Sequence, residues 1–314
     1  MWFGAHLPLI DPDITEPALL AGFVDAARSA GFRAISANDH VLFGRPWLDG
    51  LVALSSVVER SADLTLATTV ALPVIRGPAV LAKTAAALDV VSGGRFVLGL
   101  GPGSSAADYA AVGIPFAQRW PRFDESVRVL RASLTDDREP GPRQFYDVPD
   151  LAPRPPRSVP IWIGSWGSAA GLRRVARHGD AWIASAYNTT PDRLAAGRRL
   201  LLDEVGAVER DVGDLPIVLA TMWTYLTDSV AAQHERLDTL ARMLKRDTVD
   251  LAQQVLIGSA DSGVATLTRY ADAGVDGVFI WPLADPIEQL HRFGTEVAPH
   301  LRGVTTSHRD TRES

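Results

Sequence analysis

The chain has 314 residues, of which 46% are hydrophobic and 22% are charged, the balance of a globular protein with a large core. Its net charge of −6 gives no electrostatic reason to expect nucleic acid or an anionic membrane as a partner, and the lack of cysteine excludes disulfides and thiolate chemistry. No apolar run reaches the roughly 18 residues of a membrane helix and no signal core follows Met1, so we expect a cytoplasmic protein.

Short apolar runs alternate with amphipathic segments along almost the whole chain. Eight of these runs predict strands, and several are continuously apolar or β-branched, as buried parallel strands are. The predicted strands cover 3–8, 32–37, 64–70, 95–100, 161–163, 180–184, part of 215–226, and 277–281. The segments between them predict helices over 19–30, 51–60, 81–91, 124–134, 168–178, 191–205, 229–254 (one or two helices), 262–273 and 285–301.

This alternation predicts a (β/α)8 TIM barrel, with insertions at its C-terminal face, as a single domain over residues 1–302. A doubly wound sheet is less favoured, because no GxGxxG follows the first strand. The irregular segment 135–160, with seven prolines, is expected to pass over the barrel mouth. The polar tail 303–314 is expected to be disordered.

Polar side chains follow the predicted strands at their carboxyl ends, where barrel enzymes carry their chemistry. Asp39 and His40 end the second strand, and a carboxylate beside an imidazole can form a general acid/base pair. Equally, Asp39 could cap the following turn and leave His40 exposed. His6, near the end of the first strand, is a candidate for the substrate pocket.

Tryptophans are candidates for the rest of that pocket. We expect Trp47 and Trp281 to line it, and Trp120 and Trp166 could also contribute. Metal catalysis is not predicted, because the seven histidines form no HxH or HExxH pattern. A serine nucleophile is not predicted either, since no GxSxG is present.

Two glycine-rich loops follow predicted strands. Gly101 and Gly103 come after the fourth strand, where glycine lets the backbone approach a flat or phosphorylated ligand. The fifth strand is followed by Gly164-Ser165-Trp166-Gly167-Ser168 and a helix N-terminus, which favours an anion. Capping of that helix by Ser168 is an equally good structural explanation.

Three segments together resemble a known family. LDVVSGGRFVLGLGPGS (88–104) is similar to the most characteristic segment of the bacterial-luciferase-like monooxygenases, a superfamily that also holds deazaflavin-dependent oxidoreductases. GFRAISANDH (31–40) and PIWIGSWGSAA (160–170) resemble two further family patterns. The resemblance implies that Asp39 contacts the flavin ring and that His40 transfers a proton. It also implies a non-prolyl cis peptide at Thr69-Val70 behind the ring.

By the same resemblance the cofactor contacts are Asp39, Thr69, Val70, Gly101, Gly103, Gly164, Ser165, Gly167 and Ser168. FMN-binding members often carry an arginine in the loop after strand four, whereas GLGPGSS has none, which favours coenzyme F420 over FMN. Deazaflavin sugar-phosphate dehydrogenases carry a glutamate in this loop, but here Asp108 is the nearest acid. We therefore expect an apolar or aromatic small-molecule substrate.

The leading hypothesis is thus a hydride-transferring oxidoreductase that uses F420. One alternative is an FMN-dependent monooxygenase that needs dioxygen and a flavin reductase as partner. Another is a non-catalytic, flavin-binding barrel, against which the retained Asp39-His40 and both glycine loops argue. The family usually dimerises, so a homodimer is expected.

Overall fold

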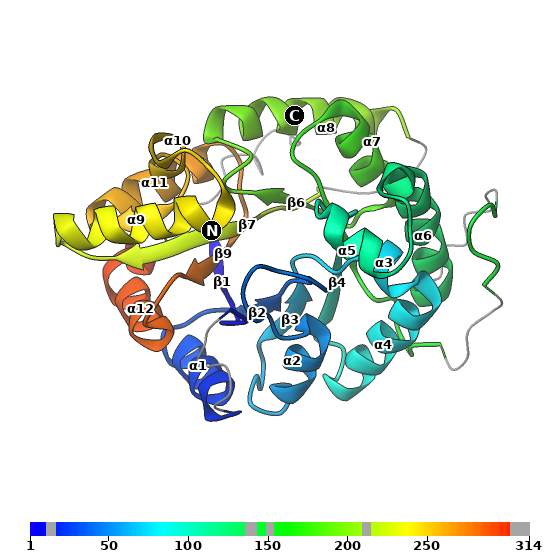
Figure 1. Cartoon of the computed structure of the whole chain (residues 1–314), viewed down its shortest axis with the longest axis horizontal. Coiled ribbons are helices and arrows are strands. Elements are labelled where there is room, and N and C mark those ends of the chain that lie inside the picture. Colours follow the sequence, from blue (N-terminus) through cyan, green and yellow to red (C-terminus); the bar gives the residue numbers. More distant parts are fainter. Residues whose placement is uncertain (11–16, 136–142, 149–153, 209–214, 302–314) are drawn as a thin grey trace, which may run out of the picture.

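In the computed structural model, parallel strands form a closed barrel surrounded by helices (Figure 1). The structure describes residues 1–10, 17–135, 143–148, 154–208 and 215–301. The strands in this part of the chain are β1 (Trp2–His6), β2 (Ala34–Ala37), β3 (Thr65–Thr68), β4 (Phe96–Leu100), β5 (Ile161–Gly164), β6 (Ala181–Ser185), β7 (Ile217–Leu226), β8 (Leu256–Gly258) and β9 (Gly277–Pro282). Eight of them close the ring in the order β1-β2-β3-β4-β5-β6-β7-β9, which confirms the predicted TIM barrel.

The described α-helices mostly connect consecutive strands. They are α1 (Pro17–Ser29), α2 (Gly50–Ser56), α3 (Pro73–Arg76), α4 (Pro78–Val91), α5 (Ala106–Ala111), α6 (Arg119–Leu134), α7 (Ala169–His178), α8 (Pro191–Gly206), α9 (Val230–Leu244), α10 (Thr248–Ala252), α11 (Ala260–Asp272) and α12 (Pro286–Arg292). Short 3-10 and π-helical turns follow at Phe116–Gln118, Phe293–Val297 and Ala298–His300. None of the helices in the described ranges is both long and apolar enough to span a bilayer.

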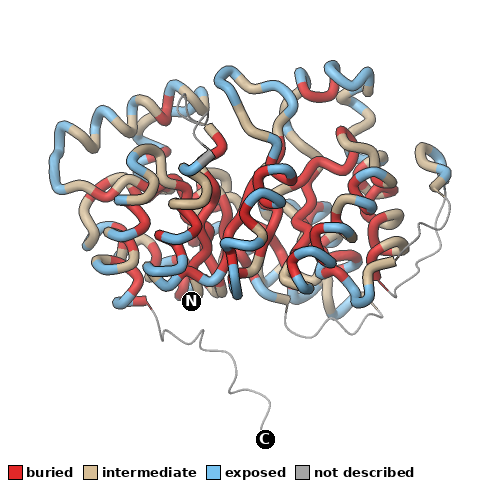
Figure 2. Tube along the Cα trace, turned by 90° about the horizontal axis from the view of Figure 1, so that it is seen from below, coloured by how far each residue is buried: buried red, intermediate tan, exposed pale blue. Residues whose placement is uncertain are grey.

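The strands form a buried layer inside an outer layer of helices whose outward side is exposed to solvent (Figure 2). All residues of β2 and β4 are buried, in agreement with the continuously apolar sequence of β4 and with a β2 sequence whose one polar residue is Ser36. Inside the barrel the ring of Phe279 packs edge-on against Trp2, with 5.5 Å between the ring centroids. Gly4 makes this packing possible, because a Cβ there would lie 2.3 Å from Cε1 of Phe279.

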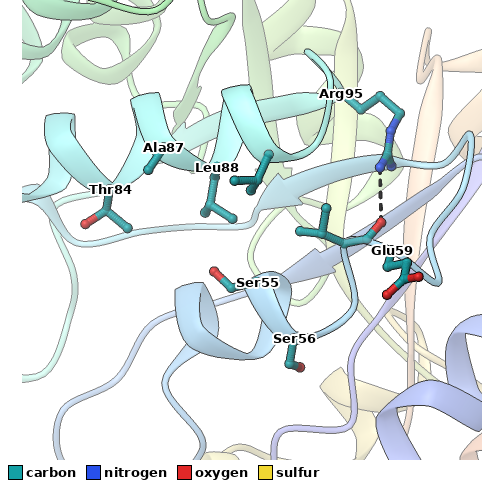
Figure 3. A pocket seen from close by; sticks show the side chains of 9 residues that line it. Ser55, Ser56, Glu59, Thr84, Ala87, Leu88 and Arg95 are labelled. Carbon is teal, nitrogen blue, oxygen red and sulfur yellow. Dashed lines mark hydrogen bonds between the residues drawn. The ribbon is translucent and has the colours of Figure 1, made fainter. Parts of the chain in front are cut away.

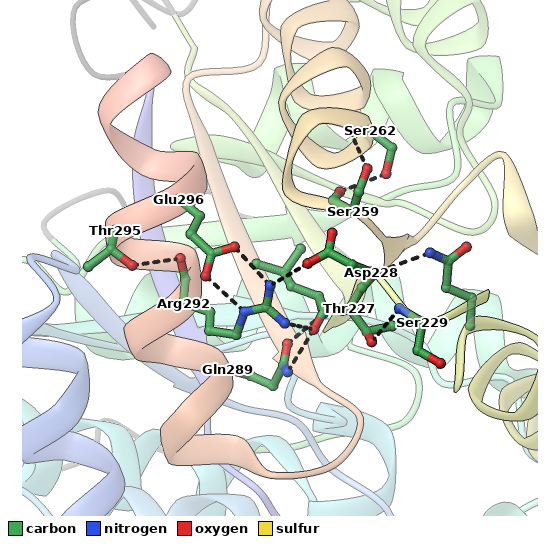
Figure 4. A network of polar contacts seen from close by, with 11 residues as sticks. Thr227, Asp228, Ser229, Ser259, Ser262, Gln289, Arg292, Thr295 and Glu296 are labelled. Carbon is green, nitrogen blue, oxygen red and sulfur yellow. Dashed lines mark hydrogen bonds and ion pairs between the residues drawn. The ribbon is translucent and has the colours of Figure 1, made fainter. Parts of the chain in front are cut away.

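Strand β7 is the main departure from a regular barrel. Its register against β9 shifts between Leu219 and Met222, and Thr221 between them has a φ of 58°. Beyond this bulge, Thr224 to Leu226 pair with β8, a strand too short to be expected from the sequence. Figure 4 shows how α12 holds the end of β7: Gln289 exchanges two hydrogen bonds with the backbone of Leu226, and Arg292 donates a third to its carbonyl at 2.6 Å.

The expectation that segment 135–160 passes over the mouth is wrong for its described parts. The carboxylate of Glu125 on α6 accepts backbone hydrogen bonds from Gln144 to Tyr146, so this piece lies on the outer side of α6 (Figure 1). Arg157 pairs with Asp89 near the end of α4 at 3.4 Å. The segment follows a helix and precedes a strand, so it begins at the opposite face of the barrel.

The insertions at the C-terminal face come instead from connections that follow strands. They are the loop 38–49, the stretch from α5 to the turn at Phe116–Gln118, and the stretch from α9 to α10. The predicted tail 303–314 lies outside the described residues.

Candidate functional site

His40 is paired with a carboxylate from a different loop of the barrel mouth. Its Nδ1 lies 3.2 Å from Oδ2 of Asp108, whose Oδ1 accepts the backbone N–H of Leu42 at 2.7 Å. Asp108 lies in the first turn of α5, which is capped by Ser105, and its side chain is 2% exposed. With Nδ1–H donated to Asp108, the neutral ring keeps Nε2 as an acceptor for another partner. The arrangement is that of an oriented general base.

Two aromatic rings pack against the imidazole of His40. Phe43 and Trp47 lie against it, with ring centroids 5.1 and 4.7 Å away. The His40 side chain is 22% exposed, so it keeps an open edge. The indole N–H of Trp47 is buried and has no hydrogen-bond partner in the structure. Trp47 thus lies beside His40, and its place in a substrate pocket stays a prediction.

Asp39, in contrast, does not orient His40. Arg76 donates two hydrogen bonds to its carboxylate, at 2.6 Å to Oδ2 and 2.7 Å to Oδ1, and the backbone N–H of Leu72 donates another. Burial opposes the charge of Arg76, but its bonds to Asp39 and Asp49 outweigh this and raise the pKa of Arg76. The predicted pairing of Asp39 with His40 is wrong, because the guanidinium of Arg76 already occupies both carboxylate oxygens.

The end of β3 carries the predicted cis peptide. The bond between Thr69 and Val70 is cis, which confirms the expectation. The hydroxyl of Thr69 is buried without a hydrogen-bond partner. The side chain of Val70 packs on Gly101, where a Cβ would come 2.5 Å from its Cγ2. Packing against Val70 is thus sufficient reason for glycine at 101, while Gly103 occupies a turn with a φ of 76°.

The second glycine loop leads into α7. Ser168 caps this helix by accepting the N–H of Gly171, and the Ser165 hydroxyl accepts the N–H of Gly167, each at 3.2 Å. The capping explanation for Ser168 therefore holds. The first-turn N–H groups of Ala169 and Ala170 have no acceptor within the helix and can still bind an anion. Trp166 is 61% exposed and Gly164 ends β5.

This half of the mouth, from β3 to β5, fits the ring and phosphate of a flavin or deazaflavin. The unpartnered Thr69 hydroxyl can bond the ring system, and the start of α7 can bond a phosphate. Among the described residues, no three His, Asp or Glu side chains gather in a way that could hold a metal ion.

His6 and Trp281 come together on the other half of the mouth. Their rings stack with centroids 3.6 Å apart, and Nδ1 of His6 donates to the carbonyl of Leu7 at 2.8 Å. Burial lowers the pKa of His6 to about 3, although its hydrogen bonds oppose the shift. Both residues line a cavity of about 30 Å³. Trp120 is not among the lining residues; it lies between the guanidiniums of Arg119 and Arg174.

A larger cavity, of about 700 Å³, lies outside the barrel between α2 and α4 (Figure 3). Its one cationic lining side chain, Arg95, donates hydrogen bonds to the carbonyls of Val58 and Leu64. The guanidinium thus ties the residue before β4 to the segment between α2 and β3. This cavity is distant from the strand ends and brings no further chemistry to them.

Sequence reasoning missed Arg76 and gave Asp108 no role. Arg76 lies 37 residues from Asp39 in the chain, and no local pattern joins the two. Asp108 had a weaker signal, as the first acid after the glycine loop of β4.

The fold and the site together define a closed parallel α/β barrel that carries an oriented histidine at the carboxyl ends of its strands. The chain belongs to the luciferase-like monooxygenase family, whose profile matches residues 11–277. It is 26% identical to the F420-dependent glucose-6-phosphate dehydrogenase of Amycolatopsis mediterranei, over 92% of this chain and 96% of that protein.

Two solved structures are similar over nearly their whole length. The monooxygenase RslO1 from Streptomyces bottropensis superimposes with a TM-score of 0.82 at 19% identity, covering 96% of this chain and 100% of that one. An F420-dependent secondary alcohol dehydrogenase, solved with an F420-acetone adduct, gives a TM-score of 0.82 at 16% identity, covering 96% and 99%. At these identities the likeness concerns the fold.

Proposed function

We propose that this protein is an F420-dependent oxidoreductase that transfers a hydride between coenzyme F420 and a small organic molecule. The observation that carries the proposal is the His40–Asp108 pair, which places an oriented imidazole at the strand ends beside a site that fits a deazaflavin. Similarity to an F420-dependent dehydrogenase over most of both chains supports this choice of cofactor.

Bound between β3 and β5, the deazaflavin would supply the hydride acceptor or donor. His40 then moves the proton: Nε2 accepts the proton of a substrate hydroxyl as the alcohol is oxidised, or returns it to the oxygen of a carbonyl in the reverse direction. Asp108 holds Nδ1–H and stabilises the imidazolium that forms. Phe43 and Trp47 limit the water around the ring.

The arginines near the phosphate site are already paired with carboxylates, and this favours F420 over FMN. A terminal phosphate monoester, as in FMN, benefits most from a guanidinium partner. The loop 101–105 has no arginine, and the two on α7 are engaged: Arg173 makes two bonds to Glu204, and Arg174 pairs with Asp124. The helix start alone suits the less charged phosphodiester of F420.

Side-by-side titrations monitored by tryptophan fluorescence test the proposal. We expect F420 to bind at least about tenfold more tightly than FMN. This ratio corresponds to the one charge-assisted hydrogen bond that the FMN phosphate lacks here. The deazaflavin chromophore without its phosphate tail serves as the control and should bind more weakly than F420. Tighter binding of FMN would instead support the FMN-dependent monooxygenase, and lack of binding by all three would overturn the proposal.

A further inference from the structure

We propose that the β1–β7–β9 half of the mouth binds the uncharged end of a largely apolar substrate, one that carries a hydrogen-bond-accepting oxygen. The identification of this ligand as the substrate rests on the proposed function. The binding chemistry itself rests on the cavity at His6, which we call the tryptophan pocket.

The tryptophan pocket is narrow, and apart from His6 and Arg45 its described lining residues are of apolar types. Its walls include Ile10, Met243 and Leu283, together with the rings of Trp223 and Trp281. At about 30 Å³ it has room for only a few atoms, since about 10–15 Å³ on this measure holds one water. It therefore takes one end of a molecule, such as a carbonyl group on a ring, rather than a whole sugar.

Two unsatisfied donors set the polarity of the ligand. The indole N–H groups of Trp223 and Trp281 are buried and have no hydrogen-bond partner among the described residues, although both side chains line the pocket. Their rings meet edge to face, with centroids 5.0 Å apart. A buried donor without an acceptor is costly, so an oxygen that accepts from either indole stabilises the complex. A purely hydrocarbon ligand would leave both donors unsatisfied.

The charges around the pocket argue against a phosphorylated ligand. His6 is buried, stacks on Trp281, and is neutral at physiological pH because burial depresses its pKa. Among the described residues that line the pocket, Arg45 is the only charged one, and it is exposed to solvent. A phosphate here would lose its hydration without a buried counter-charge, which is strongly unfavourable. The pocket is thus unsuited to the phosphorylated substrate that a sugar-phosphate dehydrogenase must bind.

The tryptophan pocket also lies where a substrate is needed, opposite the wall of the barrel that fits the cofactor. Strands β9 and β7 follow β1 around the ring, whereas β3, β4 and β5 form the opposite wall, where the deazaflavin fits (Figure 1). Loop residue His40 follows β2, between the two halves. Asn38 links them, since its side-chain amide lies 3.2 Å from Nε2 of His6. Substrate and cofactor can therefore reach His40 from opposite walls.

Calorimetric binding of three probes tests the inference: cyclohexanone, methylenecyclohexane and glucose 6-phosphate, each with and without saturating F420. Cyclohexanone should bind more tightly than methylenecyclohexane, which has the same shape but no oxygen, and glucose 6-phosphate should not compete. Trp223→Phe and Trp281→Phe keep a ring but remove the N–H, and at least one should weaken cyclohexanone binding about three- to tenfold. Trp166→Phe, a change at an exposed tryptophan outside the pocket, should leave the affinity for cyclohexanone unchanged.

Binding of glucose 6-phosphate in competition with cyclohexanone would overturn the inference. So would equal affinity for the two isosteric probes, a comparison that needs no variant to fold. If F420 fails to bind while the preference for cyclohexanone persists, the pocket chemistry stands and the proposed function fails. Circular dichroism and the melting temperature verify that each variant is folded.

Discussion

The imidazole Nδ1 of His40 lies 3.2 Å from the carboxylate of Asp108, although 68 residues separate them in the chain. His40 belongs to the loop after β2 and Asp108 to the helix after β4, so the barrel alone brings them together. The second oxygen of Asp108 accepts the N–H of Leu42, which fixes the carboxylate against the loop that carries His40. The pair is therefore a rigid feature of the mouth.

Replacing Asp108 by asparagine should reduce kcat and leave KM and the Kd of F420 nearly unchanged. An amide can present N–H to the imidazole, which selects the wrong tautomer, and it carries no charge to stabilise imidazolium. We expect a loss of at least about tenfold, a smaller effect than the roughly 10²–10⁴-fold of a whole acid or base, because the imidazole itself is kept. Steady-state kinetics and a cofactor titration measure the two effects separately.

Asp147→Asn is the matched control, because Asp147 is exposed and pairs only with Arg143 among the contacts of the described residues. It should behave as the native enzyme. An Asp108→Asn variant with full activity would show that Asp108 only anchors the loop at Leu42.

Replacing His40 by alanine should lower turnover by roughly 10²–10⁴-fold, the usual contribution of a positioned acid or base. Cofactor affinity should change little, because the contacts of His40 are with Asp108, Phe43 and Trp47. His291→Ala, at an exposed position on α12, is the control. Equal losses of binding and turnover would instead mean that His40 shapes the pocket.

The sequence was sufficient for the barrel because every strand of the ring carries its own local signal. β4, for example, is continuously apolar and entirely buried, as expected for a strand covered on both faces. β8 lacked such a signal: it has three residues, and it exists because the bulge at Thr221 lets β7 extend past the ring and pair with it.

The candidate site was only partly predictable, because its ion pairs join distant loops. Local position placed Asp39 beside His40, yet the carboxylate of Asp39 turns to Arg76 and that of Asp108 turns to His40. Nothing in the spacing of these residues indicates that Asp108, and not Asp39, is the partner of His40. His6 and Trp281 were placed at strand ends, and the closure of the ring between β1 and β9 is what stacks them.

Replacing Arg76 by methionine should destabilise the protein by about 3 kcal/mol, because it leaves the buried carboxylate of Asp39 without its counter-charge. The matched control is Arg60→Met, which breaks the exposed pair of Arg60 with Asp25 and should cost at most about 1 kcal/mol. Urea unfolding at neutral pH measures both. Similar losses in the two variants would mean that the Asp39–Arg76 pair is no stronger than a surface contact.

His6 should make the stability of the protein depend on pH. Burial lowers its pKa in the folded chain to about 3, against 6.5 for an unperturbed histidine. Between these two values the unfolded chain binds a proton that the folded chain does not, so the free energy of unfolding falls as the pH falls. Above pH 6.5 the contribution is fully present, and it is lost progressively towards pH 3.

The comparison of native protein with His6→Gln isolates this effect, because glutamine can still hydrogen-bond but does not titrate. The slope approaches about 1.4 kcal/mol per pH unit within the window, so the stability of the native protein relative to the variant should decrease by about 2 kcal/mol from pH 7.5 to pH 5. Urea unfolding curves at the two pH values measure the difference directly, and other titrating groups cancel because both proteins share them. A constant difference between the two proteins would show that His6 is protonated within the fold, and that the stack on Trp281 accommodates a charged ring.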